Sequence, residues 1–450
     1  MIPADTITSL APRLKSGDLR SERLTEDALA TITTLNPRLN AFIAVTADDA
    51  LAAARRCDQQ IAAGQYRGAL HGVPISLKDL IDVAGVATTA ASKLREHYVA
   101  QRDAPIVTRL REAGAVIVGK TNLHEFAFGT TNEDSAWGPA RHPVDETRSP
   151  GGSSGGSAVA VATGMSVASI GTDTGGSIRI PAAACGIVGL KPGYGEISAN
   201  GVVPLSRQLD HVGPLTRSVD DAELLYDVLR GVAGPAAVTE TVDGLFGVRV
   251  GVLGGYFSER LSEDVESAFQ QTVEAMRGAG ARMEPAGLAH AADIAPIYLH
   301  LVLADGAAYH AAALERKPHA YTENVRVRLE MGRYVLGEDY ARARRGREVI
   351  RREVEAALHG VDVLICPSLA VEAPPLGAAS VAVKGGKEPV RNVMLRLTQP
   401  FNLSGHPAIS IPCGATKAGL PIGLQLVGHH QRTRDLLRVA RRVERVLRPR

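Results

Sequence analysis

The chain reads Ser149-Pro-Gly-Gly-Ser-Ser-Gly-Gly-Ser-Ala-Val-Ala-Val-Ala-Thr-Gly-Met-Ser-Val-Ala-Ser-Ile-Gly-Thr-Asp-Thr-Gly-Gly-Ser177 across one stretch. Glycines flank Ser153 and Ser177, and the Ala/Val segment between them predicts a buried helix that runs into a strand. Glycine lets a backbone approach a ligand closely, and N–H groups exposed in this way can bind a developing oxyanion. The stretch therefore predicts a hydroxyl nucleophile beside an oxyanion hole. A flexible serine-glycine linker would not contain such a dense apolar segment.

Two other uses of a glycine-flanked serine fit these residues less well. The run Gly151-Gly-Ser153-Ser-Gly155 matches the Gly-x-Ser-x-Gly pattern of a nucleophile elbow. That elbow follows a hydrophobic strand, whereas residues 141–150 are polar and interrupted by proline. A phosphate-binding Walker loop needs Lys and then Ser or Thr after its last glycine, and here Gly156 is followed by Ser157.

A serine hydroxyl that attacks at neutral pH needs an adjacent base. None of the 13 histidines lies in the two serine loops, and we expect solvated side chains for three that lie in polar loops, His124, His142 and His211. Lys78, at the end of a predicted strand, is the leading candidate for the base. It could act only as a neutral amine, so burial would have to lower its pKa from about 10.4 towards about 7–8. Taken alone, Lys78 fits better as a surface lysine paired with Asp79.

Length and charge bound the class of protein. The 450 residues suffice for one large or two ordinary domains. With 50 Lys and Arg against 48 Asp and Glu, the net charge of +2 gives no electrostatic case for a nucleic-acid or membrane partner. The N-terminus has no apolar run of signal-peptide length, and no window approaches about 18 uninterrupted apolar residues. We therefore expect a cytoplasmic protein without a transmembrane helix.

The cysteines point in the same direction. The four, widely scattered along the chain, are Cys57, Cys185, Cys366 and Cys413. They form no Cys-x-x-Cys pair, so neither a zinc site nor a disulfide framework is indicated. We expect buried free thiols in a reducing compartment.

Helical and strand periodicities alternate along most of the chain. Helices are predicted within residues 5–60, over 105–113, over 263–278, through most of 290–358 and over 434–447. Strands are predicted at 72–79, 115–119, 247–253, 361–367, 408–412 and 423–427. Fully apolar strands fit a sheet that helices cover on both faces, so the prediction is an α/β fold. Residues 371–390 are predicted to form an exposed loop, and residues 231–244 a joint between strands of one sheet.

Three separated motifs resemble the amidase signature family. They are Gly151-Gly-Ser-Ser-Gly-Gly-Ser157, Gly171-Thr-Asp-Thr-Gly-Gly-Ser-Ile-Arg-Ile-Pro181 and Cys185-Gly-Ile-Val-Gly-Leu-Lys-Pro192. They agree with the family in order and spacing, as does the lysine of Val73-Pro-Ile-Ser-Leu-Lys-Asp79. The resemblance extends from about residue 36 to Gly428.

The resemblance implies a single α/β/α domain over residues 1–450, with a large mixed β-sheet core covered by helices. Within it we expect an N-terminal helical segment over about 1–65, a catalytic core over about 66–230 and a variable, substrate-side helical region over about 290–358. The resemblance also implies a Ser–cis-Ser–Lys triad, in which Ser177 is the nucleophile, Ser153 the bridging serine and Lys78 the base. The Gly152–Ser153 peptide bond would be cis. Such a triad needs no metal or other cofactor.

The same resemblance assigns further residues around the triad. The backbone N–H groups of the oxyanion hole would belong to Thr174, Gly175, Gly176 and Ser177. Supporting polar roles fall to Ser154, Asp173 and Arg179, and the acyl pocket would be lined by Ala127, Gly129 and Thr130.

Two branches of the family fit the chain. The loop Phe128–Gly138 and the block Pro407–Gly414 resemble the A subunit of tRNA-dependent amidotransferases. The Asn-Leu-x-Arg-x-Asp-Gly-x-Arg-Tyr-Gly-like segment of those proteins has no counterpart in Asp305–Arg316. We therefore expect a stand-alone amidase for small amides, with carbamate and ester side activity, that is a monomer or homodimer with no nucleic-acid or membrane partner. The alternative is a glutamine-hydrolysing A subunit.

Overall fold

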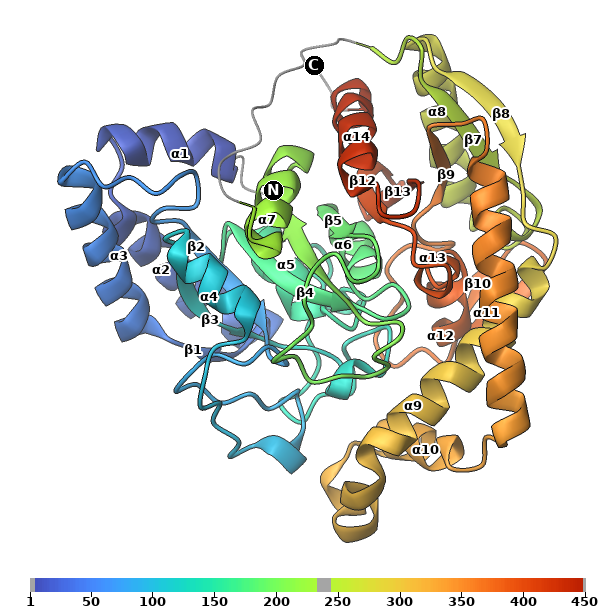
Figure 1. Cartoon of the computed structure of the whole chain (residues 1–450), viewed down its shortest axis with the longest axis horizontal. Helices are drawn as coiled ribbons and strands as arrows, with labels where there is room; N and C mark the ends of the chain where they lie inside the picture. Colours follow the sequence, from blue (N-terminus) through green and yellow to red (C-terminus); the bar gives the residue numbers. More distant parts are fainter. Residues whose placement is uncertain (1–4, 233–243, 448–450) are drawn as a thin grey trace.

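A single large sheet forms the centre of the computed structural model, which describes residues 5–232 and 244–447 (Figure 1). Within these residues the sheet has eleven strands, in the order β1-β3-β2-β4-β6-β5-β12-β13-β9-β7-β8. Their bounds are β1 (Phe42–Val45), β2 (Pro74–Lys78), β3 (Val116–Thr121), β4 (Ala168–Asp173), β5 (Val188–Lys191), β6 (His211–Thr216), β7 (Arg249–Leu253), β8 (Arg282–Ala286), β9 (Val363–Pro367), β12 (Ala408–Ala415) and β13 (Pro421–Val427). A separate pair consists of β10 (Ser380–Val383) and β11 (Gly386–Pro389).

The large sheet is mixed, as the resemblance implies. Strand β2 runs parallel to both β3 and β4, and β7 runs parallel to both β8 and β9. Between these two parallel ends, each neighbouring pair from β4 through β6, β5, β12 and β13 to β9 is antiparallel. The predicted joint at 231–244 overlaps residues outside the described ranges, and the strands on its two sides belong to this one sheet, as expected.

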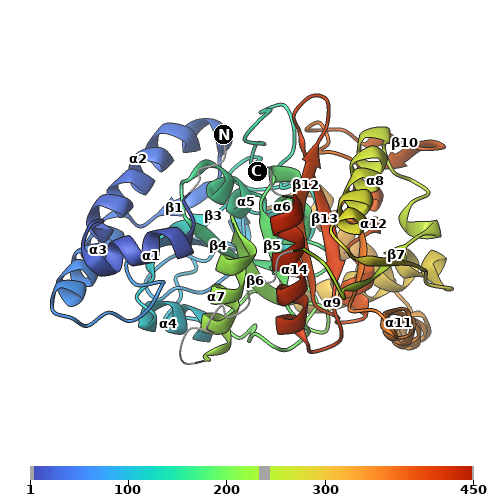
Figure 2. The ribbon, with the colours of Figure 1, turned by 90° about the horizontal axis from the view of Figure 1, so that it is seen from above.

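Helices lie on both sides of the sheet (Figures 1 and 2). Their bounds are α1 (Ile7–Ser16), α2 (Ser21–Leu39), α3 (Ala47–Ala62), α4 (Pro105–Glu112), α5 (Gly155–Thr163), α6 (Arg179–Cys185), α7 (Val219–Arg230), α8 (Glu263–Gly278), α9 (Ile294–Arg316), α10 (Glu323–Gly332), α11 (Gly337–Leu358), α12 (Val390–Arg396), α13 (Pro400–Leu403) and α14 (Thr433–Leu447). The predicted α/β fold is therefore confirmed. The functional names given to its segments stay predictions.

Burial follows the sequence pattern closely. All residues of β3, β4 and β9 are buried, as expected for apolar strands with helices on both faces. Helix α14 buries Leu436, Leu437 and Val443, whereas Arg438 and Arg445 are exposed. An apolar face of this kind attaches an amphipathic helix to the core.

Two segments differ from the prediction. The N-terminal helical segment also contains β1, which pairs antiparallel with β3 and forms the edge of the sheet. Residues 371–390 are not wholly a loop, because β10 and β11 form an antiparallel hairpin. Gly385 lies in its turn and Gly386 begins β11, and their φ angles of 85° and 145° favour glycine. Polar residues and glycines concealed this hairpin in the sequence.

The helices α9, α10 and α11 form a group at the lower right of Figure 1. Helix α9 contacts both of the others. Among the described residues, one segment, Ala291–Arg316, is long and apolar enough to cross a membrane by length and composition alone. Its buried positions include Leu301, Val302 and Leu314, which join the hydrophobic core of the domain.

All four cysteines are free thiols. Cys57, Cys185 and Cys366 are buried, as predicted, whereas Cys413 is only partly buried. The described residues contain no group of three or more His, Cys, Asp and Glu side chains that could hold a metal ion.

Candidate active site

The parallel pair β2 and β4 brings the predicted site residues to one edge of the sheet. Lys78 is the last residue of β2 and Asp173 the last residue of β4. Because these strands are parallel neighbours, their carboxyl ends lie side by side. Helix α5 contacts both strands and begins two residues after Ser153. The sheet thus gathers residues that are far apart in the sequence.

Lys78 is fully buried and makes two hydrogen bonds to hydroxyl groups. Its Nζ donates to Ser153 Oγ at 2.7 Å and to Thr172 Oγ1 at 2.9 Å. The carboxylate of Asp79 instead accepts a hydrogen bond from Lys120 Nζ at 2.8 Å. The interpretation of Lys78 as a surface lysine paired with Asp79 is therefore wrong.

Burial makes Lys78 a weaker base than an ordinary lysine. Desolvation lowers its pKa from 10.5 to about 7, and the charges of Asp173 and Asp210 only partly oppose this shift. A lysine with such a pKa is partly neutral at neutral pH. It can therefore accept a proton from a neighbouring hydroxyl group.

The two serine loops are tied together through their backbones. The Gly152–Ser153 peptide bond is cis. The backbone N–H of Ser154 donates to the carbonyl of Ser177 at 3.2 Å, and Ser154 Oγ donates to the Thr172 carbonyl at 3.2 Å. Ser177 itself is buried. The arrangement brings Lys78, Ser153 and the Ser177 loop together, while the roles assigned to them stay predictions.

In the loop before Ser177, positions 175 and 176 require glycine. A β-carbon at position 175 would clash with the Tyr298 hydroxyl and would lie 2.9 Å from Leu395 Cδ2. Gly176 has a φ of 144°, and a β-carbon there would clash with Thr398 Oγ1. The Gly175 carbonyl also accepts a hydrogen bond from Thr398 Oγ1 at 2.6 Å. These contacts fix the backbone whose N–H groups are predicted to bind the oxyanion.

Thr174 is held by an aspartate that the sequence analysis missed. Its Oγ1 donates to Asp210 Oδ1 at 2.6 Å, and the backbone N–H of Leu205 donates to Asp210 Oδ2 at 3.0 Å. Burial raises the pKa of Asp210 to about 6. Asp210 directly precedes His211, which pairs with Asp173 across β6 and β4. Nothing in the local sequence indicates that Asp210 lies beside Thr174.

Asp173 and Arg179 form a completely buried ion pair below the Ser177 loop. Arg179 Nη2 and Nε donate to the two carboxylate oxygens of Asp173 at 2.9 and 3.0 Å. Asn402 Nδ2 donates to Asp173 Oδ1 at 2.8 Å, and Gln425 Oε1 accepts from Arg179 at 2.6 Å. Burial alone would raise the pKa of Asp173, but Arg179 holds it below its usual range. The pair faces inward and supports the loop.

We expect Asp173→Asn to destabilise the fold by about 3–5 kcal/mol, because it leaves the Arg179 charge buried without a countercharge. Urea unfolding of the purified variant measures this loss. Asp27→Asn is the matched control, since its pair with Arg23 is exposed and should contribute about 0–1 kcal/mol. Equal stabilities for the two variants would contradict the structural role. Because the folded pKa is depressed, the contribution of Asp173 is present above about pH 4 and declines as the pH falls below that value.

The residues of the predicted acyl pocket, Ala127, Gly129 and Thr130, are all buried. A β-carbon at Gly129 would clash with the imidazole of His124, so this ring lies directly against the pocket. Arg328 Nη1 donates to the carbonyl of Phe128 at 2.7 Å from α10. The residues predicted to line the acyl pocket are therefore bordered by a histidine and an arginine that the sequence did not place there.

The expectation of solvated loop histidines is wrong. His124, His142 and His211 are all buried, and His211 lies on β6. His124 Nε2 lies 3.0 Å from a carboxylate oxygen of Asp134, and His142 Nε2 lies 2.8 Å from the Ala184 carbonyl. Such partners cannot be read from local composition, and they leave His124 Nδ1 and His211 Nε2 buried without a hydrogen-bond partner.

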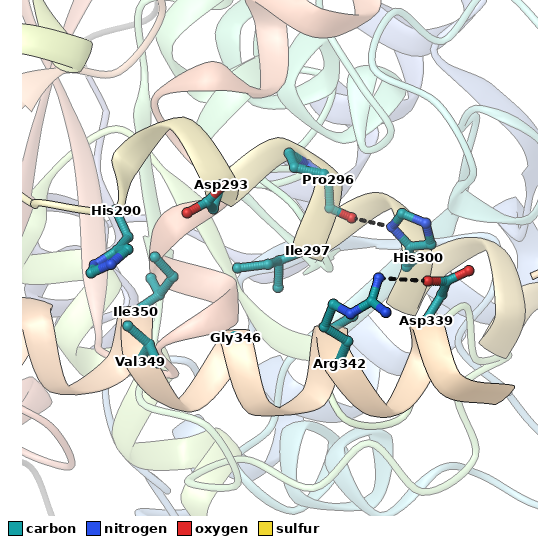
Figure 3. A pocket seen from close by; sticks show the side chains of 11 residues that line it. His290, Asp293, Pro296, Ile297, His300, Asp339, Arg342, Gly346, Val349 and Ile350 are labelled. Atoms are coloured by element: carbon teal, nitrogen blue, oxygen red, sulfur yellow. Dashed lines mark hydrogen bonds and ion pairs between the residues drawn. The ribbon is translucent and has the colours of Figure 1, made fainter. Parts of the chain in front are cut away.

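A cavity of about 600 Å³ lies between α9 and α12, next to the glycine loop. Tyr298 and Leu395 line it, and these are the two side chains that exclude a β-carbon at Gly175. A second cavity, of about 440 Å³, lies between α9 and α11 (Figure 3). In Figure 3, His300 Nδ1 points to the Pro296 carbonyl at 2.7 Å and Arg342 to Asp339 at 3.0 Å. None of the predicted site residues lines either cavity, and only the first cavity borders the glycine loop.

Comparisons with known proteins agree with this arrangement. The Amidase family matches over residues 23–437. The A subunit of glutamyl-tRNA(Gln) amidotransferase from Anaeromyxobacter sp. (strain K) is 41% identical, covering 96% of this chain and 94% of that protein. A crystal structure of an amidase has a TM-score of 0.93 at 38% identity, covering 98% of this chain and 100% of its own. The corresponding amidotransferase A subunit from Thermotoga maritima has a TM-score of 0.79 at 32% identity, covering 99% and 96%. The chain therefore belongs to the Amidase family of enzymes, the family that its serine motifs resemble.

Proposed function

We propose that this enzyme hydrolyses the carbon–nitrogen bond of small amides through an acyl-enzyme on Ser177. The observation that carries the proposal is the hydrogen bond from the buried Lys78 Nζ to Ser153 Oγ. A lysine whose pKa lies near 7 is a suitable base for a serine hydroxyl, because general bases work best when their pKa is close to the working pH.

The proposed reaction begins when Ser177 Oγ attacks the amide carbonyl carbon. The hydroxyl proton of Ser177 passes to Ser153, whose own proton passes to neutral Lys78. The N–H groups of the 174–177 loop stabilise the negative charge that develops on the carbonyl oxygen. When the C–N bond breaks, Lys78 returns the proton through Ser153 to the leaving amine. Water then attacks the acyl-enzyme by the same route and releases the carboxylic acid.

The substrates that we propose are aryl and alkyl amides, with side activity on carbamates and esters. Such a triad attacks any acyl carbon with a polarised carbonyl, so the bond is selected by fit and not by the chemistry alone. The TM-score of 0.93 to the solved amidase supports amide hydrolysis as the activity. In this proposal Ala127, Gly129 and Thr130 line the pocket for the acyl group.

A second candidate function is glutamine hydrolysis as the A subunit of a tRNA-dependent amidotransferase. The 41% identity to such a protein from Anaeromyxobacter sp. favours it. The lower TM-score of 0.79 to the Thermotoga maritima protein favours the stand-alone enzyme. The absence of the Asn-Leu-x-Arg-x-Asp-Gly-like segment from Asp305–Arg316 weighs in the same direction.

Hydrolysis rates of the purified chain on a nitroanilide, an aryl carbamate and free glutamine, with no partner protein added, distinguish the two functions. We expect turnover of the nitroanilide and the carbamate, and little release of ammonia from glutamine, because no clamp for the amino acid is indicated. Rapid glutamine hydrolysis without turnover of the other two substrates would favour the amidotransferase function, as would stable co-purification with a tRNA-binding partner.

A further inference from the structure

Arg391 is a cation without a carboxylate partner in the cavity between α9 and α12. It is partly buried, and its buried Nε has no hydrogen-bond partner. Within residues 5–232 and 244–447 it forms no ion pair. A buried polar atom without a partner costs free energy unless a ligand or ordered water completes it. Arg391 therefore requires an explanation that the fold itself does not give.

The other charged side chains of this cavity are already paired. They are Arg260 with Glu388, at 3.6 Å, and Arg396 with Glu259, at 3.4 Å. These four charges cancel, so Arg391 leaves the lining with one net positive charge. The remaining polar lining comes from neutral groups, including Asn392, Gln399 and the Tyr298 hydroxyl.

The charge of Arg391 also acts on residues beside the predicted acyl pocket. Burial lowers the pKa of His124, which lies against Gly129; Asp134 opposes this shift, and the charges of Arg328 and Arg391 add to it. Burial also lowers the pKa of Arg328 to about 10, with Arg391 again adding to the shift. Asp134, whose charge opposes both shifts, is already engaged by His124 Nε2 at 3.0 Å and by Asn324 Nδ2 at 3.1 Å.

The cavity borders the predicted oxyanion loop. Tyr298 and Leu395 line the cavity and at the same time contact Gly175 in that loop. Gln399 lines the cavity next to Thr398, whose hydroxyl donates to the Gly175 carbonyl at 2.6 Å. Arg391 therefore lines a cavity that is separated from the predicted oxyanion loop by these side chains alone.

We propose that the preferred substrates are amides whose acyl part carries a carboxylate, and that the Arg391 guanidinium binds this carboxylate. The inference rests on the proposed function and specifies its substrate class, the monoamides of short dicarboxylic acids. A guanidinium and a carboxylate form paired, charge-assisted hydrogen bonds, which makes arginine the usual residue for this recognition. Hydrolysis of such a substrate yields a dicarboxylate and an amine or ammonia.

Two matched anilides test the inference. One is the mono-4-nitroanilide of glutaric acid, and the other is the 4-nitroanilide of butyric acid, which lacks the carboxylate. We expect the intact enzyme to have a kcat/KM about 10- to 100-fold higher for the charged anilide, mainly through KM. Arg391→Gln should remove this preference and leave the rate on the uncharged anilide within about twofold, which also shows that the variant folds. Arg391→Lys should retain part of the preference, because it keeps the charge without the planar fork.

Arg23→Gln is the charge-matched control, because Arg23 is exposed on α2 and forms a surface ion pair with Asp27. Calorimetric titration of Ser177→Ala with glutarate measures binding without turnover, and adding Arg391→Gln should weaken it by at least tenfold. Equal rates on the two anilides, or equal losses on both in Arg391→Gln, would overturn the inference and leave the proposed function intact. If the intact enzyme hydrolyses neither anilide, the proposed function fails, and the glutarate titration alone decides the role of Arg391.

Discussion

Ser177→Ala is expected to reduce kcat on a nitroanilide by a factor on the order of 10³ to 10⁶. The reason is that Ser177 Oγ is the only atom that forms the acyl-enzyme in the proposed mechanism. The residual activity should come from substrate binding and from the backbone N–H groups of the 174–177 loop, which the substitution does not alter. Because the substitution only removes one oxygen from a small side chain, the fold should tolerate the change. Steady-state and single-turnover rates measure the effect.

Ser157→Ala provides the matched control for this experiment. Ser157 is also a buried serine of the glycine-rich stretch, and its Oγ pairs with Thr121 Oγ1 at 2.7 Å, with no bond to Lys78. It should lose some stability and retain most of its activity. A Ser177→Ala variant with rates close to normal would show that another group is the nucleophile. Loss of the burst of nitroaniline release would identify acylation as the blocked step.

Lys78→Arg is expected to be as inactive as Lys78→Met, with losses of about 10²- to 10⁴-fold, the usual range for removal of a general base. An arginine keeps the positive charge but does not deprotonate in proteins, so it cannot take the proton from Ser153. Lys78 is also fully buried, so an arginine at this position would place its longer side chain in the core. Lys93→Arg, at an exposed position paired with Glu96, should have normal activity.

The pH dependence of the intact enzyme tests the same role of Lys78. The neutral amine is the active form, so kcat/KM should be low when Lys78 is protonated and should rise with pH through about 7. Asp173 and Asp210 hold this pKa up, so Asp210→Asn should move the midpoint to lower pH. A flat profile from pH 6 to 9, with chemistry shown to be rate-limiting, would exclude a titrating lysine base.

Local sequence determined the elements and the chemistry that they carry. Residues 115–119 are apolar throughout, which predicts a strand covered on both faces, and β3 is buried at every position. The spacing of leucine and valine in 434–447 predicts one apolar helical face, which α14 buries. These patterns can be read from the sequence because the buried residues of a helix or strand recur with the period of that element. The glycine-flanked serines and the motif around Lys78 predicted the site for the same reason, since each is a continuous run of sequence.

Tertiary structure decided which side chains meet. Lys78 and Thr172 become hydrogen-bonded partners only because β2 and β4 are neighbours in the sheet. Tyr298 of α9 and Asp210, directly before β6, contact the loop that precedes Ser177, and Arg391 of α12 lines the cavity beside it. No periodicity in these segments indicates that approach. The burial of a side chain and the charges around it depend on every element that packs against that side chain. The lowered pKa of Lys78 and the unpaired charge of Arg391 are therefore properties of the assembled fold, whereas the serines and the lysine themselves were visible in the sequence.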